Sequence, residues 1–184
     1  GKRFVPTGGR MTPKTMSDAR FSPAIVSRDS GASGIVLVCE HASNHMPARY
    51  DNLGVSDSVL QSHVAWDPGA LGVAARLSDL LDAPLVAGGM SRLIYDCNRP
   101  PEAVGAMPAR SEIHDVPGNA ALTDDEKAAR VADIYEPFNA AVTEILTQSK
   151  ATALITIHSF TPVYHGQPRS LELGVLHDQD TRLA

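Results

Sequence analysis

Cysteine and aromatic residues are scarce in this sequence, and long hydrophobic runs are absent. Two cysteines are too few for the disulfide framework that stabilises small secreted domains. The longest apolar run, Ile35–Cys39, has the length of a strand and is far too short to span a membrane. The first twenty residues are polar and interrupted by glycine and proline, which is not the pattern of a signal peptide. We therefore expect a cytoplasmic protein with no membrane contact.

An excess of positive charge is also lacking. The formal net charge is -5, so the sequence has no reason to bind nucleic acid, which requires a basic surface. What is present is enough apolar sequence for one ordinary domain: 184 residues, 43% of them hydrophobic. We expect a flexible lead-in, or an added extension, over residues 1–34 and the folded domain over residues 35–184.

Short apolar runs predict the strands of a sheet. Residues 35–39 and 153–157 are β-branched and apolar without alternation, which is typical of strands buried on both faces. Shorter runs predict further strands at 85–87, 93–95 and 171–176. The chain ends soon after the last run, so we expect further elements of the domain beyond residue 184.

Helical segments alternate with these strands. Asp67-Pro68 favours a helix start, and a second helix opens with a capping box at Thr123 and Glu126 and meets a kink at Pro137. The stretch 100–121 reads as a long loop. Strands that alternate with helices predict an α/β domain with a mainly parallel sheet, whose ligand lies beyond the carboxyl ends of its strands.

Polar residues stand at those carboxyl ends. His41 follows the first buried strand and His158 follows the strand at 153–157. Imidazole is the commonest side-chain ligand of zinc, and a catalytic zinc has three protein ligands and an open position for water. We therefore expect His41 and His158 to bind Zn²⁺ or another divalent metal. The alternative is that each histidine only hydrogen-bonds a loop.

Two carboxylates compete for the third ligand position. Asp67 is equally suited to bind the metal or to cap the helix behind Pro68. Glu40 is adjacent to His41, and neighbouring strand residues point to opposite faces, so both can reach one metal only if the chain bends after Cys39. Either carboxylate could instead hold a metal-binding histidine in place.

A group of basic and amide residues, Arg92, Asn98 and Arg99, is suited to hold a substrate carboxylate. The guanidinium of arginine binds a carboxylate through two parallel hydrogen bonds. The alternative is a structural ion pair with Asp96. Cys39 as a nucleophile is a weaker hypothesis, because it closes an apolar run and is expected in the core.

Four segments together resemble the N-formylglutamate amidohydrolase family. They are Cys39–Pro47, Trp66–Ala70, Ser91–Pro100 and Ile157–Phe160. The resemblance implies a metal-dependent amidohydrolase that cleaves the formyl, or another acyl, amide of an acidic amino acid such as N-formylglutamate. It also implies a three-layer α/β/α sandwich similar to the zinc carboxypeptidases.

The resemblance implies roles for particular residues. His41 and His158 match metal-site histidines, Asp67 matches a recurring acidic position, and Asn98-Arg99 resembles the pair with which zinc carboxypeptidases hold a carboxylate. His41-Ala42-Ser43-Asn44 departs from the carboxypeptidase pattern His-x-x-Glu, so the remaining ligand cannot be copied. The general base would be a glutamate beyond the present end, with Glu172 the nearest available.

The expected partner is therefore a small acidic N-acyl amino acid, and the sequence leaves a homo-oligomer open. Arg99 would act with the histidines in catalysis, while Arg92 and Asn98 would help bind the substrate. Two other classes remain: a non-catalytic module that binds an acidic metabolite, and a different metal-assisted or cysteine hydrolase.

Overall fold

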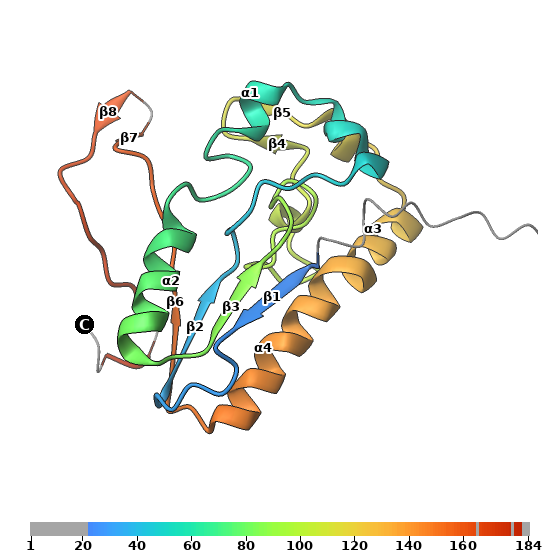
Figure 1. The fold of residues 1–184 in the computed structure, drawn as a ribbon. Coiled ribbons are helices and arrows are strands. Elements are labelled where there is room, and N and C mark those ends of the chain that lie inside the picture. The colour runs from blue at the N-terminus through green and yellow to red at the C-terminus, as the bar shows by residue number, and fades with distance from the viewer. Residues whose placement is uncertain (1–21, 165, 178, 182–184) are drawn as a thin grey trace, which may run out of the picture.

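The computed structural model describes residues 22–164, 166–177 and 179–181. At its centre lies a four-stranded sheet in the order β1–β3–β2–β6, shown in Figure 1. The central strand β2 (Ile35–Cys39) pairs in parallel with β3 (Leu85–Gly88) and with β6 (Ala153–Thr156). At one edge β1 (Ala24–Ser27) runs antiparallel to β3. The prediction of a mixed, mainly parallel sheet is confirmed.

Two helices cover the two faces of this sheet (Figure 1). Because successive strand residues point to opposite faces, the odd-numbered and even-numbered residues of β2 enter different layers. Leu37 and Cys39 pack against α2 (Ala70–Leu81), whose small Ala70 and Ala74 let it approach closely. Val36 and Val38 pack against Phe138 and Ile145 of α4 (Glu136–Ser149). The three-layer α/β/α arrangement is thereby confirmed.

The second helical segment is interrupted where proline predicts it. The capping box forms as expected: Thr123 and Glu126 cap each other's amides at the start of α3 (Asp124–Arg130). A π-helical turn, η5 (Val131–Tyr135), then leads into α4. Pro137 follows this turn directly, at the second residue of α4, and its missing amide hydrogen leaves the preceding turn without one of its helical bonds. The expected kink therefore takes the form of a widened turn just before the proline.

The prediction of a flexible lead-in over residues 1–34 is wrong at residues 24–27, which form the strand β1. Residues 24–27 pair with all four residues of β3 and so belong to the sheet. Their sequence, Ala-Ile-Val-Ser, is β-prone but short and half exposed, which is why composition alone did not separate it from its polar flanks. Residues 1–21, the rest of the predicted lead-in, lie outside the described residues.

The strand predicted at 93–95 is also wrong, because these residues form turns. Their carbonyl groups are bonded by side chains from elsewhere: Asn119 donates to Leu93, and Arg130 donates to Ile94. Leu93 and Ile94 are nonetheless fully buried. The apolar run thus predicts burial correctly, but the buried element is a turn and not a strand.

The strand predicted at 171–176 does not form either. Its large apolar residues are exposed, Leu176 almost completely. A strand needs a neighbour to complete its backbone hydrogen bonds, and in the described part of the chain none supplies them.

Short elements make up the remaining connections. They are η2 (Ala48–Gly54), α1 (Asp57–Leu60), η3 (Val104–Ala106), β4 (Arg110–Ser111), β5 (His114–Asp115), η4 (Pro117–Asn119), β7 (Val163–Tyr164) and β8 (Gln167–Pro168). The predicted loop 100–121 thus contains two 3-10 turns and a small hairpin. Among the described residues, no helix is both long and apolar enough to cross a membrane.

Candidate metal centre

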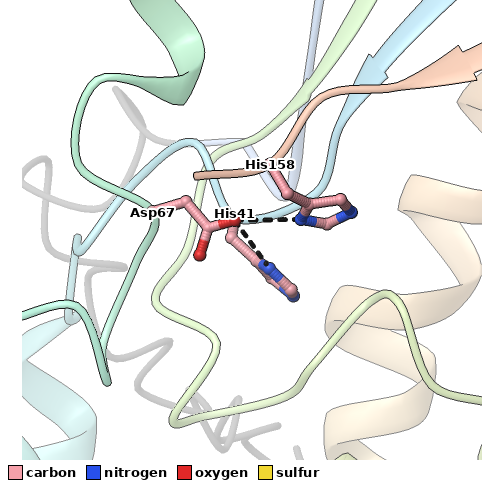
Figure 2. Close-up of side chains that lie close together, drawn as sticks. All are labelled: His41, Asp67 and His158. Carbon is pink, nitrogen blue, oxygen red and sulfur yellow. Dashed lines mark hydrogen bonds and ion pairs between the residues drawn. The ribbon is translucent and has the colours of Figure 1, made fainter. Parts of the chain in front are cut away.

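The two histidines predicted as ligands lie side by side at the carboxyl edge of the sheet. β2 and β6 are parallel neighbours, so the residues that follow them emerge together. The ring centroids of His41 and His158 are 5.0 Å apart, and Figure 2 shows both rings facing the same carboxylate. His41 is buried, whereas the side chain of His158 is 32% exposed. One histidine is therefore enclosed and the other borders solvent.

Asp67 is the carboxylate between them. Its Oδ2 lies 2.9 Å from Nδ1 of His158 and 3.4 Å from Nδ1 of His41 (Figure 2). The backbone amide of Asp67 also donates to the carbonyl of His41, which fixes the loop before α2 against the end of β2. Each of the three residues offers one ligand atom within 4.8 Å of the other two.

The alternative role of Asp67 as a helix cap is wrong. Gly69 occupies the N-cap position of α2 with φ +85°, and no side chain caps the helix. Glycine adopts this left-handed conformation without strain. The chain therefore turns between Asp67 and Ala70 without using the carboxylate of Asp67. The side chain of Asp67 is left to face the histidines.

Asp96 holds the far side of the His41 ring. His41 Nε2 lies 2.7 Å from Oδ1 of Asp96, and an ionised carboxylate can only accept, so Nε2 donates. In the neutral ring Nδ1 then carries a lone pair, which is buried, has no hydrogen-bond partner and points toward Asp67. A carboxylate that fixes the tautomer of a metal-binding histidine is a recurrent arrangement. The sequence suggested this role for Glu40 or Asp67 and missed Asp96.

The charges in this cluster raise and lower pKa values in a consistent way. Burial alone would lower the pKa of His41, but the carboxylates of Asp67 and Asp96 outweigh burial and raise it above its usual value. Burial would raise the pKa of Asp67, yet the hydrogen bond to His158 and the proximity of the His41 ring hold that pKa well below its usual range. The pKa of Asp96 is likewise lowered, because its bond to His41 and the charge of Arg92 exceed the effect of burial. The cluster therefore stabilises a positive charge next to the carboxylates of Asp67 and Asp96.

The residues present fit a divalent cation. Glu40, Asp67 and Asp96 are all buried, and Arg92 is the permanent cation that contacts two of them. Three buried carboxylates against one guanidinium leave an excess of negative charge, which is costly unless it is compensated. Protons on the histidines or a metal between them would both compensate it. The unpartnered Nδ1 of His41 favours the metal.

Glu40 lies on the other side of His158. Its Oε2 is 3.5 Å from Nε2 of His158 and has no hydrogen-bond partner. The chain turns at Glu40 and His41, the bend that the sequence required if both were to face one site. Gly88 makes room for this turn, because a Cβ there would overlap the carbonyl oxygen of Glu40. Glu40 therefore places a negative charge next to His158 without the hydrogen bond that Asp96 makes to His41.

Arg92 connects the two aspartates rather than standing apart from them. Its guanidinium lies 2.8 Å from Oδ2 of Asp96 and 3.4 Å from Oδ1 of Asp67. The ion pair with Asp96, the alternative that the sequence left open, therefore exists. Asn98 and Arg99 follow in the same turn, where the amide of Asn98 donates to Asp96 and the side chains of both residues are exposed.

Next to the cluster lies a cavity of about 260 Å³. Asp67 and Arg92 form the wall of the cavity next to His41 and His158. Ser159 and Phe160, which follow β6, continue this wall. Farther out it is bordered by His63, Val64, Ser111, Glu112, Thr161 and Arg169. Asn98 and Arg99 are not part of this lining. No pattern in the sequence points to the outer residues, because they come from loops and from the chain beside the β7–β8 hairpin.

The two cysteines are poor nucleophiles in this setting. Burial, reinforced by neighbouring carboxylates, raises the pKa of Cys39 and that of Cys97 to about 12. The reactive thiolate is therefore almost absent at neutral pH. Glu172, considered as a base, is exposed in the segment that follows the hairpin.

Comparisons with known proteins identify the family of the chain. The sequence model of the N-formylglutamate amidohydrolase family matches residues 33–184. The crystal structure of a gene product from Agrobacterium tumefaciens is similar, with a TM-score of 0.85 and 48% identity over 90% of this chain and 67% of that one. No curated protein matches. These matches imply a hydrolase that acts on an amide of a small molecule, and this chain belongs to the N-formylglutamate amidohydrolase family.

Proposed function

We propose that this protein is a metal-dependent amidohydrolase that removes the formyl, or another acyl, group from an acidic amino acid such as N-formylglutamate. The observation that carries the proposal is the buried Nδ1 of His41, which has no hydrogen-bond partner and faces Asp67 beside His158. Membership of the family supplies the reaction class. The geometry of the cluster supports the choice of His41, Asp67 and His158 as its residues.

His41, Asp67 and His158 would hold the metal, which we propose to be Zn²⁺. When bound, such an ion lowers the pKa of a bound water toward about 7 and polarises the substrate carbonyl. Asp96 keeps the proton of His41 on Nε2 and so directs Nδ1 into the site. Glu40 makes no such hydrogen bond, but its carboxylate lies 3.5 Å from Nε2 of His158 and its charge would favour a proton on that nitrogen.

The remaining residues would position the substrate. Arg92 borders the cavity and fixes Asp67 and Asp96, so its main role is to hold the ligand set in place. We propose that Asn98 and Arg99, in the exposed turn that follows, hold the α-carboxylate of the substrate. Such a contact fixes the amide relative to the attacking water and lowers the entropic part of the barrier. Arg99 would in this way contribute to catalysis through orientation.

Elemental analysis of protein purified without added metal tests the proposal. We expect about one metal ion per chain in the wild type and formate release from N-formylglutamate. His41→Ala and His158→Ala should each lose most of the metal and the activity, because two protein ligands hold zinc far more weakly than three. His114→Ala is the matched control: this histidine lies in the β4–β5 hairpin outside the cluster, and its removal should leave the metal content unchanged. A metal-free wild type, or full metal content in both ligand variants, would contradict the assignment.

A further inference from the structure

The outer wall of the cavity beside Asp67 contains a histidine paired with a glutamate. His63 and Glu112 both line this cavity, and Nε2 of His63 lies 2.9 Å from Oε1 of Glu112. An ionised carboxylate can only accept a hydrogen bond, so Nε2 carries a hydrogen atom. Nδ1 has no hydrogen-bond partner among the described residues. Nδ1 is therefore the ring atom that can take up and release a proton.

His63 belongs to the same loop as the candidate ligand Asp67 and stands four residues ahead of it. Ala65, which lies between the two, is fully buried. Its carbonyl accepts from the backbone amide of Arg92 at 3.1 Å and from the hydroxyl of Ser91 at 2.9 Å. These two bonds attach the loop to the turn that carries Arg92. The position of His63 relative to Asp67 is therefore fixed by buried backbone.

A strained turn brings Glu112 to His63. Glu112 and Ile113 are the two turn residues of the β4–β5 hairpin, which Figure 1 shows beside α1 and the chain that follows it. Glu112 has φ +52°, in the left-handed region that residues other than glycine seldom adopt. Arg110 holds this turn, because its Nε donates to the carbonyl of Glu112 at 3.2 Å and its Nη1 lies 2.8 Å from Asp115. Strain of this kind is concentrated at functional sites, where the surrounding structure maintains it.

Hydrolysis of an amide needs a proton donor, because the amide nitrogen leaves as an amine only when it is protonated. The other charged groups around the cavity are poor donors. Arg92 and Arg169 do not release a proton, and the pKa of Asp67 is held so low that this carboxylate stays ionised. Glu112 is the acceptor for Nε2 of His63. Among the described residues that line the cavity, His63 is the one histidine, and histidine is the side chain that gains and loses a proton near neutral pH.

We propose that His63 is a catalytic residue that donates the proton of Nδ1 to the leaving amine, and that Glu112 is a positioning residue that holds its ring. A histidine that is held by a carboxylate at one nitrogen and reacts through the other recurs in hydrolases of unrelated folds. The inference rests on the proposed function for the reaction, the hydrolysis of an amide beside Asp67. It does not depend on which residues bind the carboxylates of the substrate.

The protons and electrons of this reaction balance with water as the co-reactant. Attack of water forms the new C–O bond and releases one proton. The C–N bond then breaks, the electron pair of that bond stays on nitrogen, and the nitrogen takes the proton from Nδ1 of His63. The carboxylic acid that is formed ionises and releases the second proton of the water. Of these two protons, one restores the imidazolium of His63 and the other converts the amine into an ammonium ion.

Kinetics on an amide and its matched ester test this role. The amide is N-formyl-L-glutamate, and the ester is the formate ester of the corresponding α-hydroxy acid, in which oxygen replaces the NH group. An alkoxide leaves without prior protonation far more easily than an amine anion, so the ester needs the proton donor less. In the zinc-loaded protein, His63→Ala should lower kcat for the amide about 100-fold or more, and kcat for the ester less than about fivefold. Glu112→Gln should lower kcat for the amide about tenfold and leave kcat for the ester unchanged.

Chemical rescue separates a catalytic role of His63 from a structural one. Imidazole added to His63→Ala should restore part of the activity on the amide, because it can enter the space that the ring leaves in the cavity wall. A loss caused by altered structure should not respond to imidazole. The wild type with the same imidazole measures any inhibition through the metal. His114→Ala is the matched control: this histidine lies in the same hairpin but outside the cavity lining, and its removal should leave kcat on both substrates unchanged.

Nitrogen-15 NMR of the imidazole rings tests the His63–Glu112 pair without any turnover. In the neutral ring of His63 the hydrogen should reside on Nε2, and Glu112→Gln should weaken this preference. A neutral ring with its hydrogen on Nδ1 overturns the proposed role. So does an active wild type whose His63→Ala variant keeps its activity, or loses it equally on both substrates without rescue, and this outcome leaves the proposed function standing. A wild type that hydrolyses neither substrate overturns the proposed function and this inference together.

Discussion

Asp96 contacts His41 and is not among the candidate metal ligands, so we expect it to act on the metal only through His41. Replacing it by asparagine removes the charge while keeping an oxygen that can accept from His41 Nε2. We expect Asp96→Asn to weaken zinc binding about 10- to 100-fold, as loss of a carboxylate behind a ligating histidine generally does. Competition with a chromophoric chelator measures the affinity directly.

The control for this change is Asp133→Asn, an exposed aspartate whose ion pair with Arg49 lies away from the cluster. Its zinc affinity should equal that of the wild type. If Asp96→Asn also binds zinc as tightly as the wild type, Asp96 holds Arg92 rather than tuning His41. Circular dichroism of each variant verifies that the fold is intact.

At the residue scale, the sequence predicted the residues that stand directly after strands. Parallel neighbouring strands end at one edge of a sheet, which predicts that His41 and His158 converge, and they do. The sequence cannot decide between two roles for Asp67, because helix capping and metal binding use the same side chain. The outer residues of the cavity, Arg169 among them, could not be predicted in this way. Arg169 follows the β7–β8 hairpin and not a strand of the central sheet.

At the scale of elements, the turn at 93–95 shows where local patterns fail. An apolar run predicts burial, and Leu93 and Ile94 are buried. Whether such a run becomes a strand depends on what satisfies its backbone groups. Here the partners are side chains of Asn119 and Arg130, which lie 26 and 36 residues farther along the chain. No local window contains that information.

These partners make the turn sensitive to one buried amide. Asn119 donates to the carbonyls of Leu93 and Pro108 and accepts from Arg130. Asn119→Ala leaves these groups without partners, so we expect the free energy of unfolding to fall by about 2–4 kcal/mol. Urea denaturation measures the change. Because Asp96 follows this turn, zinc affinity should fall as well.

Asn139→Ala is the matched control, since Asn139 is exposed on α4. Alanine favours the helix, so the free energy of unfolding should stay within about 0.5 kcal/mol of the wild type or rise. An equal effect of the two substitutions would show that the network around Arg130 does not stabilise the turn.

At the scale of the whole molecule, the layers could be predicted because each depends on a repeating pattern. The continuous apolar run of β2 requires cover on both faces, and α2 and α4 provide it. The antiparallel edge strand β1 could not be predicted, since four half-exposed residues form too short a pattern to indicate a strand. The exposure of residues 171–176 could not be predicted either, because a strand forms there only if a neighbouring strand is present.

The stability of the whole molecule should depend on pH in opposite ways with and without metal. In the metal-free protein the pKa of His41 is raised above its ordinary 6.5, because the carboxylates of Asp67 and Asp96 outweigh burial. The stability that His41 contributes is thus fully present below about pH 6.5 and is lost as pH rises through the folded-state pKa. The pKa values of Asp67 and Asp96 are lowered, so their contribution is present above their ordinary 3.8 and is lost as pH falls below it. Metal-free protein should therefore be most stable between about pH 4 and 6.5.

Zinc requires deprotonated ligands and competes with the proton on His41. The rise in Tm that zinc produces over protein in EDTA should consequently be small near pH 5.5 and grow as pH increases toward 8. Thermal unfolding at a series of pH values, with and without zinc, measures this difference. In His41→Ala the growth with pH should largely disappear, because the competing proton is gone along with the ligand. A zinc effect on Tm that is equal at pH 5.5 and pH 8 would show that His41 does not exchange a proton for the metal.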